Sequence, residues 1–122
     1  MLTKDTVLYR KAFAFAVRVV KLYQIIAENK KEYILPKQLL RSGTSIGANV
    51  SEANGAISSP DFSSKISIAY KESLETKYWL SLLKETGFVT MEAFSSLHND
   101  ADELSKILFS VLKTTRLKPG SN

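Results

Sequence analysis

The sequence contains no cysteine and only three prolines and five glycines among its 122 residues. Without cysteine, neither disulfide bonds nor thiolate metal sites can form, and nothing indicates an oxidising compartment. No stretch approaches the roughly 20 consecutive apolar residues that a bilayer-spanning helix needs. The N-terminal segment also lacks the charged start and apolar core of a signal peptide. We therefore expect one cytoplasmic domain, long enough to bury a core without covalent staples.

The scarcity of proline and glycine leaves four long segments with helical periodicity and no credible strand. The first runs from about Asp5, a good N-cap, to about Asn29. The second begins near Pro36, whose missing N–H would be unpaired in a first helical turn anyway. It ends at Asn54 and Gly55, where we expect a left-handed C-cap.

The third and fourth segments are delimited by similar signals. Residues 59–61 (Ser-Pro-Asp) offer an N-cap hydroxyl, a preset φ and an acid beside the positive helix end, and Gly87 ends that helix. Thr90 caps the fourth segment. Because short connections force long helices to be antiparallel, the sequence predicts an all-α, up-down-up-down four-helix bundle over residues 1–117, with a frayed tail at 118–122.

Apolar residues at helical spacing identify the faces that we expect to form the core. Gly43 and Gly47 of the second segment would let another helix approach closely, although each costs roughly 1 kcal/mol of helix propensity against alanine. The predicted seams are Leu39, Ile46, Val50, Ala53 and Ile57 in the second segment, Phe62, Ile66, Ala69, Ser73, Thr76, Leu80 and Leu83 in the third, and Phe94, Leu97, Ala101, Leu104, Leu108 and Val111 in the fourth.

The first segment carries more apolar surface than one bundle can bury. A bundle helix normally buries a stripe of roughly 100°, and the apolar side chains here cover far more than that. The third and fourth segments add Trp79, Leu82, Ile107, Phe109 and Leu112 beside their seams. A large apolar surplus on a small domain is typical of a subunit interface, so we expect a homo-oligomer. The first segment's apolar residues are Phe13, Phe15, Val17, Val19, Val20, Leu22, Tyr23, Ile25 and Ile26.

Charge on the first segment is entirely of one sign between Asp5 and Glu28. Its cations form a basic strip, defined as Arg10, Lys11, Arg18 and Lys21, to which Arg116 at the end of the fourth segment could add. With a formal net charge of +5 for the chain, this strip indicates either a nucleic-acid surface that contacts phosphates or merely a solvated face. An oligomer would multiply the strip, and repeated weak phosphate contacts would sum to strong binding.

Polar residues on the second and third segments could meet across an antiparallel pair. One interpretation is a paired-carboxylate centre for a metal or for acid–base catalysis. Di-metal bundles, however, need about four carboxylates with two Glu-x-x-His repeats, and the single histidine, His98, follows no such glutamate. We therefore predict no catalytic residues, no metal site and no cofactor, and instead an interhelical hydrogen-bond network that sets register. Its predicted members are Arg41, Asn49, Glu52, Glu72 and Glu75.

Three segments resemble the motif blocks of the four-helix-bundle proteins named for intervening sequences in bacterial 23S ribosomal RNA: SGTSIGANVSEANG, SSPDF and IAYKESLETKYWLSLLKETG. The resemblance covers roughly residues 9–113. A more distant similarity is to the accessory variability protein of diversity-generating retroelements. The chain departs from the family pattern after Glu52. Many members have glycine directly after this glutamate, whereas here Ala53 and Asn54 come before Gly55. The resemblance implies a closed homo-oligomeric ring, typically a pentamer, with basic surfaces suited to nucleic acid and no established biochemical activity.

Two classes of function remain open at this point. The first is an oligomer that binds RNA or DNA backbone through the basic strip, without a base-reading motif. The second is an assembly adaptor that presents helix faces to a protein partner such as a reverse transcriptase or an RNA-processing factor. Catalysis is the class with the least support in the sequence.

Overall fold

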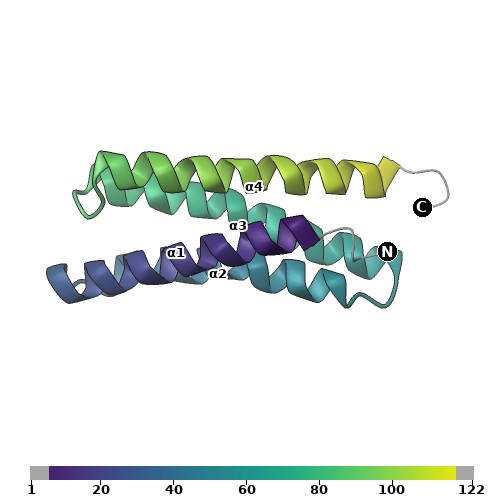
Figure 1. Ribbon diagram of the computed structural model, residues 1–122, viewed down its shortest axis with the longest axis horizontal. Helices are drawn as coiled ribbons and strands as arrows, with labels where there is room; N and C mark the ends of the chain where they lie inside the picture. The colour runs from purple at the N-terminus through teal and green to yellow at the C-terminus, as the bar shows by residue number, and fades with distance from the viewer. Residues whose placement is uncertain (1–5, 118–122) are drawn as a thin grey trace.

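The computed structural model describes residues 6–117, which form four α-helices and contain no strand (Figure 1). The helices are α1 (Thr6–Lys30), α2 (Ile34–Asn54), α3 (Ser59–Glu85) and α4 (Met91–Leu117). The all-α prediction with four helices is confirmed over this part of the chain. The predicted cap Asp5 and the predicted frayed tail, residues 118–122, lie outside the described residues.

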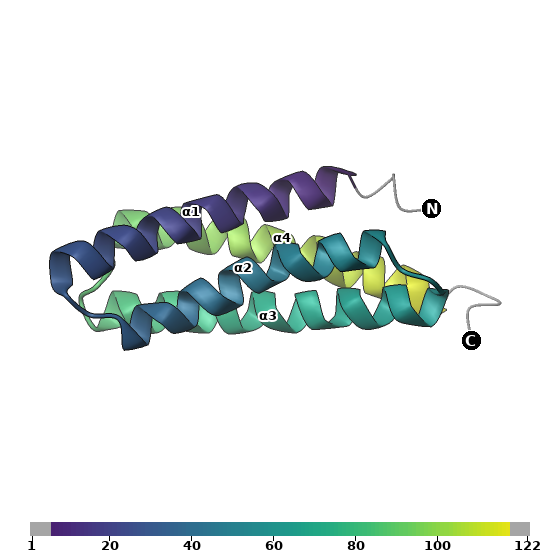
Figure 2. The same cartoon turned by 90° about the horizontal axis from the view of Figure 1, so that it is seen from below.

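Each helix runs antiparallel to the helices beside it (Figures 1 and 2). Contacts show this directly, because residue numbers rise on one helix while they fall on its neighbour: Lys11 of α1 pairs with Glu103 of α4, and Arg18 pairs with Asp100. The packing of α1 on α2 is more extensive than its packing on α4. The equivalent pairs elsewhere are Val19 near Gly43 and Ala12 near Gly47 for α1 and α2, Arg41 with Glu75 and Glu52 with Lys65 for α2 and α3, and Lys77 with Asp102 and Tyr70 with Phe109 for α3 and α4.

The core follows the predicted seams closely. All seven residues predicted on α3 are buried, and four of the six predicted on α4 are buried while Phe94 and Val111 are half-buried. Leu112, predicted as surplus, is buried in the core instead. Ile57 was expected on the α2 seam, but it is 92% exposed, because α2 ends at Asn54 and the helical periodicity cannot extend past that end.

The helix ends differ from the predictions in two places. Gly55 has φ −103°, so the expected left-handed cap of α2 is wrong. The left-handed conformation occurs instead at Gly87, after the end of α3, where φ is +85°. The residue that caps α3 is Ser58, one position earlier than expected, and its side chain accepts a hydrogen bond of 3.1 Å from the N–H of Asp61. Thr90 caps α4 as predicted, because its hydroxyl accepts a 3.1 Å hydrogen bond from the N–H of Ala93.

Two pairs of buried hydroxyl groups link the helices inside the core. The Thr76 hydroxyl donates to the Ser42 Oγ over 3.0 Å and thereby joins α3 to α2. Ser73 of α3 and Ser105 of α4 share a hydrogen bond of 2.7 Å. Thr76 and Ser73 also bond to carbonyl oxygens of their own helix, at 2.7 and 2.6 Å. A buried hydroxyl without a partner costs about 1–3 kcal/mol, so the register is favoured chiefly through Ser42 and Ser105, which meet these partners only when the helices are packed.

Glycine brings α2 close to α1 at two positions with different clearance. A Cβ at Gly43 would lie 2.9 Å from the Cγ2 atom and 3.0 Å from the Cγ1 atom of Val19, which is closer than van der Waals contact allows. A Cβ at Gly47 would lie 3.5 Å from the carbonyl oxygen of Ala12, which is an ordinary contact. The close approach therefore depends on glycine at position 43 more strictly than at position 47.

Candidate nucleic-acid interface

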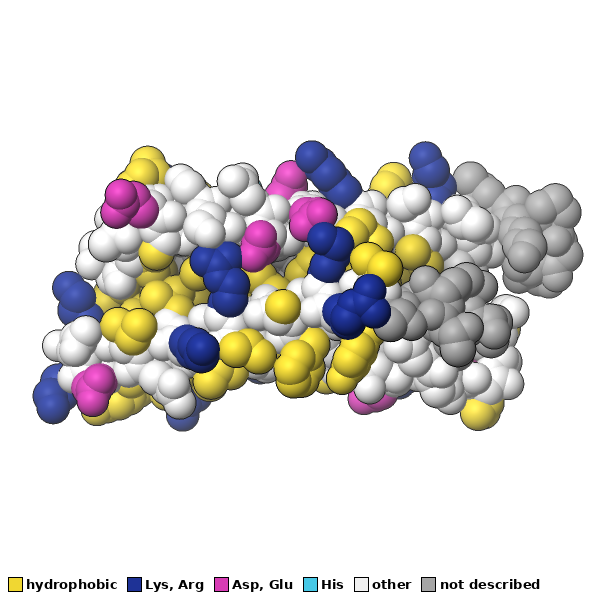
Figure 3. Space-filling view, in the orientation of Figure 1, with side chains coloured by type: hydrophobic (Ala, Val, Ile, Leu, Met, Phe, Trp, Pro, Cys, Tyr) yellow, Lys and Arg dark blue, Asp and Glu magenta, His cyan; other side chains and the backbone are white. Residues whose placement is uncertain are grey.

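The candidate interface lies on α1, a helix of 25 residues that contains neither glycine nor proline. All four residues of the basic strip are exposed. At 100° per residue, Lys11 and Arg18 lie on one line along the helix, and Arg10 and Lys21 lie on a second line about 100° away. The strip therefore divides into two rows with different surroundings. In Figure 3 lysine and arginine side chains gather over α1, with acidic side chains close beside some of them.

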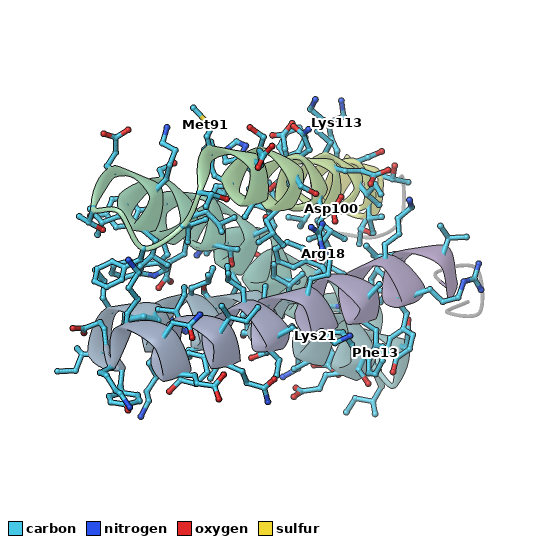
Figure 4. The ribbon with its side chains drawn as sticks, turned by 60° about the vertical axis from the view of Figure 1, so that its left-hand side comes forward. Phe13, Arg18, Lys21, Met91, Asp100 and Lys113 are labelled. Atoms are coloured by element: carbon cyan, nitrogen blue, oxygen red, sulfur yellow. The ribbon has the colours of Figure 1, made fainter. Side chains whose placement is uncertain are left out.

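The row formed by Lys11 and Arg18 faces α4 and is paired with acids on that helix. The Lys11 Nζ atom lies 3.2 Å from Glu103 Oε2, and the Arg18 Nη1 atom lies 2.6 Å from Asp100 Oδ2. The second guanidinium nitrogen of Arg18 donates to the hydroxyl of Ser96 over 2.9 Å. Arg18 reaches across to Asp100 in the space between the two helices (Figure 4). Half of the strip is thus neutralised within the subunit.

The row formed by Arg10 and Lys21 faces away from the bundle. Neither side chain forms an ion pair with any other residue in 6–117. Phe13, which is 56% exposed, and Val17 lie between them on the same outward face of α1. These two cations are therefore available to an external ligand, and they are flanked by exposed apolar surface.

The end of α4 lies at the same end of the bundle as the start of α1 (Figure 1). Lys113 is exposed there and its Nζ atom lies 5.8 Å from the ring centroid of Phe109. Arg116 belongs to α4, but its side chain is outside the described part of the structure.

Three members of the predicted polar network come together between α2 and α3. Arg41 forms ion pairs with Glu72, at 3.4 Å, and with Glu75. The indole N–H of Trp79 donates to the Glu75 Oε2 atom over 2.8 Å. This hydrogen bond, followed by the interaction with Arg41, lowers the pKa of the Glu75 carboxyl. The bond to Glu75 in turn raises the pKa of the Arg41 guanidinium, so both groups are held in their charged forms.

The other two predicted members lie apart from this cluster. Asn49 donates to the carbonyl oxygen of Ser45 over 2.9 Å and to its hydroxyl over 3.1 Å, within its own helix. Glu52 forms an ion pair of 3.0 Å with Lys65 of α3, which raises the pKa of that lysine. The prediction that Asn49 belongs to the interhelical network is wrong, because its amide bonds to Ser45, one turn earlier in α2. Helix periodicity correctly places Asn49 and Glu52 on one side of α2, but each side chain bonds to a nearer partner, Ser45 or Lys65.

A second interhelical charge cluster was not anticipated from the sequence. Lys77 of α3 lies 3.0 Å from Asp102 of α4, and Lys106 lies 3.1 Å from the other oxygen of the same carboxylate. The hydrogen bonds from Lys77 and then Lys106 lower the pKa of the Asp102 carboxyl. The spacing of Asp102 and Lys106 at i and i+4 was a visible signal, whereas the partner on α3 was not.

Two groups of exposed apolar side chains lie on the outward faces of the bundle, apart from others near the helix ends such as Ile34 and Ile57. On α1, Phe13, Val17 and Ile25 are exposed while Phe15, Val19 and Ile26 are buried, so the predicted surplus is real. Trp79, by contrast, is half-buried and bonded to Glu75. Since α1 and α3 each pack on α2 and α4, they lie diagonally and their outward faces point to opposite sides. The second group lies on α3 and α4 and consists of Ile68, Leu74, Tyr78 and Phe109.

Comparison with known proteins identifies the family. The model of the 23S rRNA-intervening sequence protein family matches residues 4–110, which is most of the sequence. The chain belongs to this family. The resemblance of the motif blocks in residues 42–87 is thus confirmed.

A solved structure supports the same assignment. The chain is similar to a protein with unknown function from the S23 ribosomal protein family of Bacteroides thetaiotaomicron, with 48% identity and a TM-score of 0.86. The match covers 88% of this chain and 99% of that chain. No curated protein shows significant similarity to the sequence.

The described residues contain neither a metal-binding cluster nor a membrane-spanning helix. Within residues 6–117, no group of three or more histidine, cysteine or acidic side chains is placed so that it could hold a metal ion. None of the four helices is long and apolar enough to cross a membrane. The described surface of this family member therefore offers ion pairs, exposed cations and exposed apolar side chains.

Proposed function

We propose that the protein is a non-catalytic, homo-oligomeric bundle of the cytoplasm that binds nucleic acid, foremost RNA, through the basic strip of α1 with little sequence preference. The observation that carries the proposal is the outward row of α1, where Arg10 and Lys21 are exposed and unpaired among residues 6–117. Cations that contact phosphates supply affinity without reading bases. The description of the family, which names 23S rRNA, supports RNA as the ligand.

Oligomerisation is part of the proposal because two free cations bind a polyanion weakly. We propose a closed ring, with five subunits as the resemblance implies, that repeats the strip around its circumference. A cyclic ring uses two different faces of each subunit, and exposed apolar side chains are present on α3 and α4 and on α1, where Ile25, one turn after Lys21, is 54% exposed. Linked sites of this kind bind far more strongly than one site alone.

The test is charge reversal at the two unpaired cations. The variant Arg10→Glu/Lys21→Glu should lose most of its affinity for a fluorescein-labelled oligouridylate, measured by fluorescence anisotropy. Lys11 and Arg18 are left unchanged, because a glutamate at either position would face Glu103 or Asp100 and weaken the packing of α1 on α4. The matched control, Lys37→Glu/Lys71→Glu, changes the net charge equally at exposed positions on other helices.

The expected result is a loss that is specific to the α1 variant. Wild type should bind with an affinity that falls steeply with salt, by about 0.7 in the logarithm for each single-strand phosphate contact and each tenfold rise in salt. Circular dichroism should show that both variants remain folded. Equal affinity of wild type and the α1 variant would refute the proposal.

An adaptor that binds a protein partner is the second candidate, and the exposure of Phe13 favours it. This aromatic ring is 56% exposed and stacks on Tyr9 with the ring centroids 6.0 Å apart. Rigid aromatic side chains are enriched at the energetic centres of protein interfaces. The variant Phe13→Ser should then abolish binding of a co-encoded protein, with light scattering as the control for subunit assembly, because Phe13 also belongs to the exposed apolar group of α1.

A further inference from the structure

In the row formed by Lys11 and Arg18, each cation already has an acidic partner on α4. Asp100 and Glu103 lie one turn apart on α4 and place their carboxylates on Arg18 and Lys11 of α1. All four side chains remain substantially exposed, with between 41% and 54% of each side chain accessible. A carboxylate and a phosphate present the same kind of anionic oxygen to a guanidinium or an ammonium group. The protein's own acids therefore occupy the positions that a polyanion would take.

We propose that the α1–α4 seam is a phosphate-binding site for a nucleic-acid backbone, which Asp100 and Glu103 occupy in the free protein and whose affinity they limit. The inference rests on the proposed function. Asp100 and Glu103 are competing residues, since their role is to hold Arg18 and Lys11 until phosphates displace them.

The spacing of the two cations argues for a polyanion and against a single phosphate. Lys11 and Arg18 are seven residues apart, which corresponds to about 10 Å along the helix axis at 1.5 Å per residue. One phosphate group cannot bridge that distance. A nucleic-acid strand carries phosphates at short, regular intervals, so it can place one on each cation at the same time.

The exposure of the ion pairs makes the exchange feasible. Water and salt screen an exposed pair, so that each contributes only a factor of roughly 1.4 to 5 to an equilibrium constant. Arg18 also keeps the hydroxyl of Ser96 within 2.9 Å, and this contact can persist when Asp100 leaves. Two such pairs should together lower the affinity for a polyanion by about twofold to 25-fold per engaged subunit.

The experiment removes the competing charges and leaves the cations in place. Asp100→Asn/Glu103→Gln should bind the labelled oligouridylate more tightly than wild type, by about twofold to 25-fold for each engaged subunit, in an anisotropy titration of the full chain at fixed salt. The matched control is Glu85→Gln/Glu92→Gln, which removes two exposed acids beside the turn between α3 and α4. The control reports the effect of net charge away from the α1–α4 seam, together with the release of Lys84 from its 3.3 Å ion pair with Glu85.

A second comparison separates competition from a structural role. Adding Lys11→Gln/Arg18→Gln to the α4 variant should erase the gain in affinity, because the acids act through these two cations. Thermal melting supplies a further readout: the α4 variant should lose a little stability while it gains affinity. A purely structural role would lower the stability without raising the affinity.

Each outcome decides the inference. Tighter binding by the α4 variant than by its control, lost when the cations are removed, supports it. Equal binding by the α4 variant and its control overturns the inference and leaves the proposed function standing if wild type binds. Absence of binding by wild type, control and α4 variant alike overturns the proposed function together with the inference.

Discussion

The two glycines that face α1 should respond to alanine with opposite signs. At Gly43 a Cβ would lie 2.9 and 3.0 Å from the two γ-methyl groups of Val19, which is buried and cannot move aside freely. Overpacking of this kind typically costs about 1–3 kcal/mol, and the gain in helix propensity from glycine to alanine returns about 1 kcal/mol. We expect Gly43→Ala to lower the free energy of unfolding by up to about 2 kcal/mol.

At Gly47 the same substitution meets ordinary contacts. The nearest atom to a Cβ would be the Ala12 carbonyl oxygen at 3.5 Å, so the propensity gain is not opposed. We expect Gly47→Ala to raise the free energy of unfolding by up to about 1 kcal/mol. Gly47→Leu should instead lower it by about 1–3 kcal/mol, because the longer side chain would extend into the backbone of α1.

Urea unfolding followed by circular dichroism measures these differences, at one protein concentration because subunit association also contributes to stability. Val19→Ala supplies the control, since it removes both methyl groups that crowd position 43. In that background Gly43→Ala should become stabilising. If Gly43→Ala stabilises the parent protein as much as Gly47→Ala does, the close approach of α1 and α2 at Gly43 is refuted.

Three further predictions address assembly, acid sensitivity and the core. Light scattering at micromolar concentration should report a mass several times the 13.6 kDa of one chain, and a stable monomer would contradict the ring. Folding lowers the pKa of the Glu75 and Asp102 carboxyls from ordinary values of 4.5 and 3.8. Their contribution to stability is therefore present above those values and lost as the pH falls below about 4.5. Urea midpoints that do not change between pH 5 and pH 3 would contradict this. Thr76→Val, which leaves the Ser42 hydroxyl without its donor, should lower the free energy of unfolding by about 1 kcal/mol, measured by urea unfolding, with Thr86→Val on the exposed turn as the control.

The seams of the bundle could be predicted from the sequence because burial in a helix repeats with the helical period. On α3 the seven residues of the predicted seam, from Phe62 to Leu83, follow that period, and all seven are buried. The prediction was wrong at Ile57, which follows the same spacing past the end of α2. Periodicity describes a face of a helix, whereas the position of the helix end depends on local capping and on the turn that follows.

The polar residues show where periodicity stops being informative. Arg41, Asn49 and Glu52 lie on one side of α2, yet each has a different partner: Arg41 pairs with Glu72 and Glu75, Asn49 bonds within its own helix, and Glu52 pairs with Lys65. Which residue of the next helix a long side chain can reach depends on how far the two helices are shifted along each other. That offset is a property of the packed bundle and has no counterpart in the spacing along one segment.

The sequence alone was sufficient to establish four helices, their core faces, the basic character of α1 and the family. Those properties depend on residue type and on a repeat within one helix, both of which are local. Only the tertiary structure showed that Asp100 and Glu103 neutralise Lys11 and Arg18 while Arg10 and Lys21 stay free. The pairs join residues 82 and 92 positions apart in the chain, so they exist only once α4 packs against α1 and brings its acids within reach of the strip.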